Sequence, residues 1–394
     1  MIYLDFAKAF DKVDHGILLR KLVDLGIDAG LIRWVKSFLT NRKQKVEVDG
    51  KHSREAEVVS GVPQGSVLGP LLFLVHIGDI DENVTSARIS SFADDTRIMK
   101  QVKSVSDCDD LQRDLSMVYK WVQSNNMTLN DEKFEALRYG EHPVRHIVYK
   151  TERGLDIAQK ESVRDLGVLV QNNARFVEHI ATTVRKCHRQ IGWVLRTFQT
   201  REPLPMLILY KALVVPIAEY CCQLWNPMAI GEITKLEGVQ RTFTSRIAGL
   251  QDFNYWQRLD KLNLYSLQRR RERYIIIYVW KILTGLAPNF EREDLGIKAQ
   301  GEGTRLGRKC LLPPLVRTRE GTIRDQSFSV MGPRLFNAIP VALREFDGSL
   351  STFKSKLDGF LGGVEDKPPL PGYYDAAGGN SITQQLAHVR AQQH

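Results

Sequence analysis

The chain has 394 residues, 43% hydrophobic and 26% charged, with a formal net charge of +9. This composition excludes a fibrous or disordered protein and predicts two or three globular domains, and the positive charge favours an anionic partner such as nucleic acid. Five cysteines without C-x-x-C pairs indicate reduced thiols in a cytosolic or nuclear protein. No apolar run approaches the roughly 20 residues that span a bilayer, and no signal segment is visible, so neither a membrane nor a secreted protein is expected.

The N-terminal region begins with a short apolar strand, Ile2–Leu4, which ends at the carboxylate of Asp5. Between residues 16 and 40 the apolar side chains follow helical spacing with glycine interruptions, which predicts two packed helices. Residues 44–48 and 54–59 alternate around an Asp-Gly pair, which is typical of a β-hairpin.

A loop of small residues follows at 60–70 and leads into an apolar run at 71–77 that we predict to be a helix. Glycines in such a loop allow the backbone to approach a flat ligand, so Gln64, Gly65 and Ser66 suit contact with a nucleobase or a phosphate. A plain Gly/Pro loop before a core helix has the same composition. The residues of this loop alone leave both interpretations open.

Two adjacent aspartates, Asp94 and Asp95, stand at the tip of a hairpin that we predict over residues 87–99. Neighbouring carboxylates repel each other, and they are stable when solvated or when a divalent cation neutralises them. A solvated surface turn is therefore the alternative to a metal site. If the strand before Asp5 neighbours this hairpin, Asp5 and Asp94 can share a cation, as in a two-metal phosphoryl-transfer site.

The central part of the chain continues with a helix over 105–125, apolar on one face, and with strands at 135–139 and 163–170. Long helical patterns then begin at Phe176 and cover 176–200, 203–224, 230–250 and 264–284. Their arginines and lysines are interleaved with tryptophans, which suits contact with a phosphate backbone; solvated helix faces are the alternative.

The C-terminal part loses the helical pattern between 285 and 307. Residues 309–316 and 321–330 are predicted to be extended, and residues 351–361 to form a short helix. Glycine and proline are frequent from Gly362 onward, so the tail to His394 is expected to be disordered.

Three ordered motifs resemble the reverse transcriptases of non-LTR (LINE-type) retrotransposons of the jockey or CR1 type. They occupy Asp5–Asp11, Gly61–Phe73 and Phe92–Thr96. The resemblance implies an α+β fold of the right-hand polymerase type, in which an antiparallel palm sheet with packed helices is followed by a helical thumb and a mixed C-terminal region. It places the palm and partial fingers in 1–175, the thumb and connection in 176–290, a small region of unknown role in 291–361, and the tail in 362–394.

The implied activity is that of an RNA-directed DNA polymerase, which transfers dNTPs to a primer 3′-hydroxyl along an RNA template. Asp5, Asp94 and Asp95 would hold two Mg²⁺ ions, for which Mn²⁺ can substitute, and the reaction would take place in the nucleus or cytoplasm. Lys133 occupies the position of a lysine that protonates pyrophosphate in the family, although a lysine in a turn is usually only solvated.

The resemblance also implies residues that contact substrates, each with an ordinary structural alternative. Phe10 matches the bulky residue that excludes a ribose 2′-hydroxyl, and the alternative is a core aromatic. Gln64, Gly65 and Ser66 match the loop beside the incoming nucleotide and template. Leu166 and Gly167 match the primer-grip hairpin, for which a β-bulge glycine is the alternative.

The chain departs from the family at both ends. The fingers strands that precede Leu4 in family members are absent, as are an endonuclease domain and a zinc knuckle, which predicts an N-terminally truncated protein. The alternative function is therefore a catalytically inactive retroelement remnant that at most binds nucleic acid.

Overall fold

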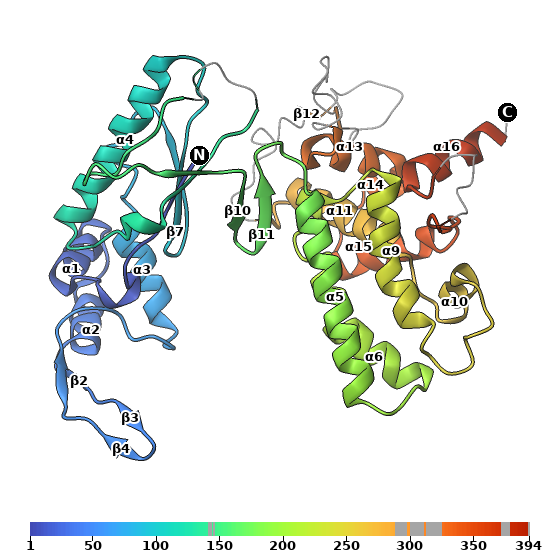
Figure 1. The fold of residues 1–394 in the computed structure, drawn as a ribbon, viewed down its shortest axis with the longest axis horizontal. Coiled ribbons are helices and arrows are strands. Elements are labelled where there is room, and N and C mark those ends of the chain that lie inside the picture. Colours follow the sequence, from blue (N-terminus) through green and yellow to red (C-terminus); the bar gives the residue numbers. More distant parts are fainter. Residues whose placement is uncertain are drawn as a thin grey trace. The chain divides into compact units, whose positions relative to one another are not determined.

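The computed structural model describes residues 1–140, 144, 146–287, 298–299, 311–312, 325–371 and 379–392. The chain forms two compact units, Met1–Ala174 and Arg175–His394 (Figure 1). The first unit ends one residue before the boundary expected at 175. The boundary expected at 290 lies outside the described residues, and residues on both sides of it belong to the second unit. No helix in the described ranges has the length and apolarity needed to cross a lipid bilayer.

The first unit is built on a five-stranded sheet with the order β6-β7-β1-β8-β9, antiparallel except for the β8–β9 pair. The strands are β1 (Ile2–Leu4), β6 (Arg88–Phe92), β7 (Asp95–Met99), β8 (Glu135–Leu137) and β9 (Ala158–Lys160). In the central strand, Ile2 lies opposite Ile98 on β7 and Ala136 on β8, and all three side chains are buried. The fold is therefore α+β with a largely antiparallel sheet, as predicted.

In the described part of this unit, the helices are α1 (His15–Asp24), α2 (Ala29–Leu39), α3 (Leu68–Ile77) and α4 (Val105–Ser124), and each lies close to its predicted range. Helix α4 begins at a capping box, in which the Ser104 hydroxyl and the Asp107 carboxylate each bond the other residue's backbone N–H. Its apolar side chains at Leu111, Leu115 and Val118 have the i, i+4, i+7 spacing of one face and are fully buried in the core of the unit.

The predicted hairpin near residue 50 is present and begins two residues earlier than expected. Strand β2 (Arg42–Gln44) pairs with β5 (Ala56–Val58), and β3 (Glu47–Val48) pairs with β4 (Lys51–His52) at its tip. A second separate hairpin consists of β10 (Ser162–Asp165) and β11 (Val168–Gln171). The strand expected over 163–170 is thus two strands, and the hairpin that the resemblance implies at Leu166 and Gly167 is present, because both residues have positive φ and reverse the chain.

The second unit is helical in its first half, with α5 (Val177–Thr197), α6 (Pro203–Leu213), α7 (Val215–Glu219), α8 (Cys222–Trp225), α9 (Ile230–Thr244), α10 (Tyr255–Lys261) and α11 (Leu267–Leu283). The prediction of one helix over 203–224 is wrong, because the segment is broken twice. Pro216 has no N–H to donate and disfavours helical geometry in the residue before it, and Cys221 has a left-handed backbone with φ of 52°.

The C-terminal half contains β12 (Lys298–Ala299), β13 (Leu311–Leu312), α13 (Phe328–Ala338), α14 (Val341–Arg344), α15 (Leu350–Leu361) and α16 (Ile382–Gln392). The extended segments expected at 309–316 and 321–330 lie largely outside the described residues, and the second ends inside α13. The described residues of the tail are ordered, in contrast to the predicted disorder. Ile382 is fully buried, and the Asp366 carboxylate accepts a hydrogen bond from Ser266 N at 2.7 Å.

Candidate active site

The strand register brings Asp5 and Asp95 to the same edge of the sheet. Leu4 on β1 pairs with Thr96 on β7. Asp5 directly follows Leu4, and Asp95 directly precedes Thr96, so in antiparallel strands the two aspartates lie across from each other where the pairing ends. Two residues that are 90 positions apart in the sequence are thereby held at one site.

Asp94 lies in the turn that precedes Asp95. Phe92 and Asp95 form the last pair of the β6–β7 ladder, so Ala93 and Asp94 are the two central residues of the turn. Ala93 has φ of 52°, the positive value that tight hairpin turns require at their first central position. The predicted hairpin tip is confirmed, and it offers both neighbouring carboxylates at the end of the sheet that also carries Asp5.

The electrostatics of this edge are dominated by negative charge. Partial burial raises the pKa of Asp95 above its usual value, and the carboxylates of Asp94, Asp165 and Asp5 raise it further, in this order. Asp165 directly precedes the Leu166-Gly167 turn, which the resemblance assigns to a primer-grip hairpin, and the folded chain shows that its charge acts on Asp95.

The donor chemistry of this edge suits a hard divalent cation, since several carboxylates crowd one another and a cation would relieve their repulsion. Within the described ranges, however, no group of three or more Asp, Glu, His or Cys side chains is arranged to hold a metal ion. The backbone thus brings Asp5, Asp94 and Asp95 to one edge, while their side chains do not form a closed metal cage.

Lys133 is a cation that reaches this edge. It lies in the 3-10 turn η2 (Asp131–Lys133), and its Nζ donates to Asp5 Oδ2 at 3.2 Å. Both side chains are partly exposed, 64% for Lys133 and 38% for Asp5, so this ion pair adds little to the stability of the fold. The position of Asp5 itself is fixed by its backbone, because Asn130 N donates to Asp5 O at 2.8 Å.

The loop with Gln64 is fastened to the segment after Asp5. Val62 N donates to Phe10 O at 2.9 Å, and Gly61 N donates to Val13 O at 2.8 Å. Gly61 has φ of 84°, and a Cβ on it would lie 2.8 Å from the backbone of Asp11, so only glycine fits this contact. The second and first sequence motifs therefore form one structural unit.

The predicted nucleotide-binding residues occupy this unit in different ways. Gln64 is exposed, and its Nε2 donates to Asp11 Oδ1 at 2.9 Å. Gly65 is exposed with φ of 81°, and Ser66 holds the loop by donating to Pro63 O at 2.7 Å. The Phe10 ring is partly buried and stacks on Phe73, with centroids 4.5 Å apart, which matches the core-aromatic alternative.

The predicted primer-grip residues, Leu166 and Gly167, form the exposed turn of the β10–β11 hairpin. Asp165, at the end of β10, forms an ion pair with Arg97 on β7 and accepts a hydrogen bond from the Tyr3 hydroxyl on β1 at 3.4 Å. These contacts attach the turn to β7, which begins at Asp95, and to β1, which ends directly before Asp5. None of them could be expected from sequence spacing.

Comparison with known proteins finds similarity to reverse transcriptases and to the polymerases of mobile elements. A family model described as "Reverse transcriptase (RNA-dependent DNA polymerase)" matches residues 1–170. The RNA-directed DNA polymerase from mobile element jockey of Drosophila melanogaster is 29% identical over 263 residues, which is 63% of this chain and 28% of that protein. The corresponding jockey protein of Drosophila funebris is 28% identical over 258 residues, again 63% and 28% of the two chains.

A third relative, the Pol polyprotein from type-1 retrotransposable element R2 of Popillia japonica, is 30% identical over 149 residues, covering 35% of this chain and 24% of that protein. The chain thus spans less than a third of the length of these relatives. Among solved structures, telomerase from Candida albicans in complex with a fragment of telomeric RNA aligns with a TM-score of 0.31 and 12% identity, over 70% of this chain and 46% of that one.

Proposed function

We propose that the chain carries the polymerase chemistry of a non-LTR retrotransposon, because the reverse transcriptase family model matches residues 1–170 and the jockey polymerase is 29% identical over 263 residues. The reaction is RNA-directed addition of dNTPs to a primer 3′-hydroxyl. The observation that supports it best is the pairing of Leu4 with Thr96, which places Asp5 across from Asp95 with Asp94 in the adjoining turn.

In this proposal Asp5, Asp94 and Asp95 are the residues that hold two Mg²⁺ ions. Such ions, when bound, activate the attacking hydroxyl and neutralise charge on the leaving pyrophosphate. The raised pKa of Asp95 supports the assignment, because crowded carboxylates gain most from a bound cation. Lys133, next to Asp5, is placed to donate a proton to pyrophosphate once its contact with the carboxylate is released.

The remaining residues of the site bind and orient substrates in this proposal. The exposed Gln64 and Gly65 face the incoming nucleotide and template, while Ser66 keeps their loop in shape. Phe10 restricts the space beside the ribose, and its stacking on Phe73 keeps the ring in place. Leu166 and Gly167 contact the primer, with Asp165 fixing their turn to the sheet.

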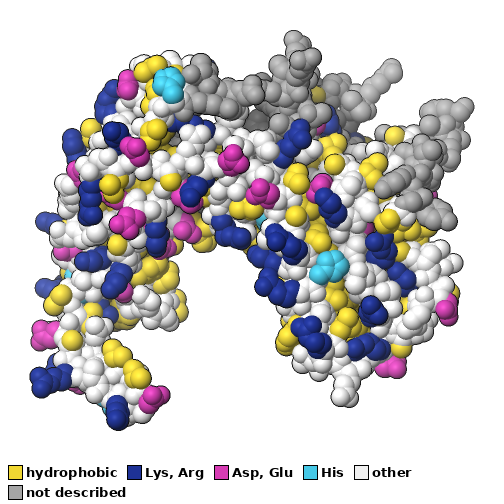
Figure 2. All heavy atoms as spheres, in the orientation of Figure 1, with side chains coloured by type: hydrophobic (Ala, Val, Ile, Leu, Met, Phe, Trp, Pro, Cys, Tyr) yellow, Lys and Arg dark blue, Asp and Glu magenta, His cyan; other side chains and the backbone are white. Residues whose placement is uncertain are grey.

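A helical thumb in the second unit completes the proposed right-hand architecture. Helix α5 has an exposed face that carries Arg185, Arg189, Trp193 and Arg196 at a spacing of three to four residues. Figure 2 shows Lys and Arg side chains gathered over the surface where Figure 1 draws α5. Such a face follows phosphates without reading sequence, so the RNA template and DNA primer are the proposed partners, in the nucleus or cytoplasm.

Primer extension on an RNA template tests this function directly. The full chain with Mg²⁺, a DNA primer and dNTPs should incorporate nucleotides, and Asp94→Ala should lower the rate at least about a hundredfold, since it removes charge at the reacting centre. Asp81→Ala changes an exposed aspartate outside the sheet and serves as the matched control with an unchanged rate. A folded wild-type chain without incorporation would instead support the inactive remnant.

A further inference from the structure

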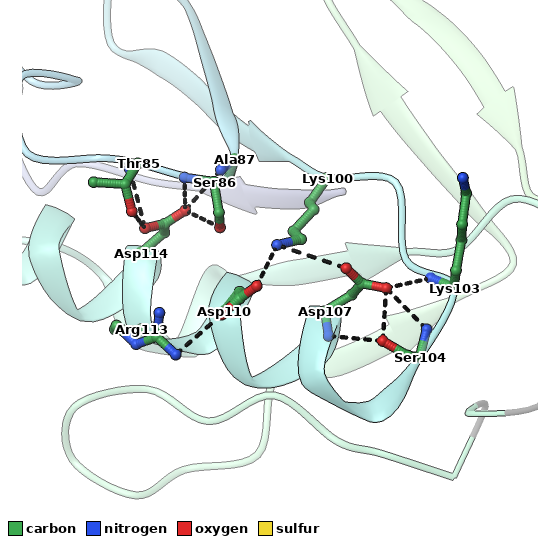
Figure 3. A network of polar contacts seen from close by, with 10 residues as sticks. All are labelled: Thr85, Ser86, Ala87, Lys100, Lys103, Ser104, Asp107, Asp110, Arg113 and Asp114. Carbon is green, nitrogen blue, oxygen red and sulfur yellow. Dashed lines mark hydrogen bonds and ion pairs between the residues drawn. The ribbon is translucent and has the colours of Figure 1, made fainter.

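Helix α4 contacts the hairpin that carries Asp94 and Asp95 at the end opposite to these aspartates. Arg88 and Met99 form the first pair of the β6–β7 ladder, so Ala87 and Lys100 flank its open end. Each strand has five residues, which separates this end from the turn by about 16 Å at the usual rise per residue. Figure 3 shows that acidic side chains of α4 reach both flanks.

Asp114 holds the chain that enters β6. The residue is 1% exposed, and its carboxylate accepts five hydrogen bonds from three consecutive residues. These are Ala87 N at 2.7 Å, Ser86 N at 2.9 Å, Ser86 Oγ at 2.6 Å, Thr85 N at 3.3 Å and Thr85 Oγ1 at 3.4 Å. Burial on its own raises the pKa of Asp114, but the donors of Ser86, Thr85 and Ala87 outweigh this and lower the pKa below its usual value.

Asp107 and Asp110 hold the chain that leaves β7. The Lys100 side chain is 10% exposed, and its ammonium nitrogen lies 2.8 Å from Asp110 Oδ2 and 3.8 Å from Asp107 Oδ1. Asp107 also accepts hydrogen bonds from the backbone N–H groups of Lys103 and Ser104 at 2.8 and 2.9 Å, which fixes the connection into α4. The three aspartates are spaced i, i+3, i+7 and therefore lie on one face of the helix.

Along its length the hairpin is also held by the ion pair of Arg97 with Asp165 and by the buried side chains of Thr96 and Ile98. Strand β6 is the edge of the sheet, and β7 is joined to β1 by the pairs of only three residues, Ile2, Tyr3 and Leu4. A shift of one residue in such a ladder moves a side chain by roughly 3 Å and turns it to the other face. Contacts with α4 on both flanks of the open end therefore suit the task of fixing the register of β7, and with it the position of Asp95 relative to Asp5.

We propose that Asp107, Asp110 and Asp114 form a clamp on α4 that positions the Asp94-Asp95 hairpin against Asp5. They are positioning residues, because they lie at the far end of the strands and touch no reacting group. A role of this clamp in catalysis rests on the proposed function. The claim that the clamp holds the hairpin in position does not depend on that function.

Hydrogen exchange of the full chain tests the mechanical claim without relying on activity. In Asp114→Asn and in Lys100→Gln, the amides of residues 88–99 should exchange about tenfold faster or more, while those of α1 change less than about twofold. Asp109→Asn is the matched control, since Asp109 is an exposed aspartate of the same helix. Lys100→Gln keeps the test decisive if the buried Asp114 variant does not fold.

Mn²⁺ titration of the same variants gives the second readout. A displaced hairpin should weaken Mn²⁺ binding by about fivefold or more in both variants, in contrast to the Asp109→Asn control. Equal exchange rates in the hairpins of the control and the clamp variants, or equal acceleration in α1 and in the hairpin, would overturn the clamp. Absence of polymerase activity in the wild-type chain would contradict the proposed function and leave the exchange result valid.

Discussion

At the scale of single residues, the site combines charges of the same sign that the fold keeps close together. Asp95 has three carboxylates around it that raise its pKa, and Lys133 is a cation that contacts Asp5. Because these groups are partly exposed, their mutual repulsion is screened by solvent and the fold tolerates it. The repulsion among these carboxylates disfavours folding, and the same negative charge favours the binding of a cation.

A buried histidine makes the first unit sensitive to pH. His76 on α3 is fully buried near Trp121, and burial, followed by the charge of Lys21, lowers its pKa from 6.5 to about 4. Between pH 6.5 and 4 the unfolded chain therefore binds a proton that the folded chain does not. The contribution of His76 to stability is complete above pH 6.5 and decreases as the pH falls towards 4, by about 3 kcal/mol in total.

Urea unfolding at about pH 7 and about pH 5 measures this dependence. His76→Phe keeps an aromatic ring beside Trp121 and should lose less stability between the two pH values than the wild-type chain. His52→Gln changes an exposed histidine and should retain the wild-type dependence. An unchanged pH dependence in His76→Phe would show that other groups are responsible.

At the scale of elements, backbone contacts between distant segments hold the site together. The Gln64 loop lies on the segment Phe10–Val13, and the β10–β11 hairpin is attached to β7 and β1 through Asp165. The ion pair of Asp165 with Arg97, for example, joins positions 68 residues apart. The loops are thus positioned by the sheet, which is the usual way in which a rigid scaffold presents a functional loop.

Two glycines of the same loop provide a matched test of the first attachment. Gly61 and Gly65 have nearly the same left-handed backbone, but a Cβ on Gly61 would collide with the backbone of Asp11, whereas Gly65 faces open space. Gly65→Ala should lower the free energy of unfolding by about 1–2 kcal/mol from backbone strain alone. Gly61→Ala should lower it clearly more, because the loop must also move away from Asp11.

Denaturant titration of both variants at one pH distinguishes backbone strain, which both variants share, from the additional collision with Asp11 in Gly61→Ala. The decrease in stability of Gly61→Ala should exceed that of Gly65→Ala, and primer extension should decrease more strongly as the Gln64 loop shifts. Equal decreases in stability would mean that the close approach at Asp11 relaxes without cost.

At the scale of the whole molecule, two units with separate hydrophobic cores share a chain with a net charge of +9. The family match covers the first unit, and the second unit contributes the exposed basic face of α5. Long-range positive charge accelerates encounter with nucleic acid, while individual arginines on one face determine the salt dependence of binding.

Binding of the full chain to a primer–template duplex at several salt concentrations tests the role of this face. Replacing Arg189 and Arg196 together by Gln should reduce the slope of log K against log salt by about 1 to 2, because each neutralised phosphate contributes about 0.9 to the slope. The double variant Lys354→Gln/Lys356→Gln removes the same charge from exposed positions of α15 and should leave the slope nearly unchanged. Equal slopes in both double variants would exclude α5 as the contact surface.

Local patterns in the sequence were sufficient to predict most elements and to single out three carboxylates for the candidate site. Apolar periodicity predicted α4 and α5 within a few residues, and three ordered motifs indicated the family and named Asp5, Asp94 and Asp95. These features depend on residues that are close in the chain. Sequence reasoning went wrong where a local break was overlooked, as at Pro216, and where a tail of low-complexity composition finds distant partners, as at Asp366.

The way in which the elements restrain one another is visible only in the folded molecule. The contacts of Asp114 with Ala87, of Asp165 with Arg97 and of Gln64 with Asp11 join positions 27 to 68 residues apart. Asp114 is a polar residue among the apolar positions of α4, and this pattern indicates a buried carboxylate that needs partners. Which residues become its partners depends on the segment that the folded sheet places beside the helix. Hydrogen bonds and ion pairs act over a few ångströms in space, and separation along the chain does not encode that distance.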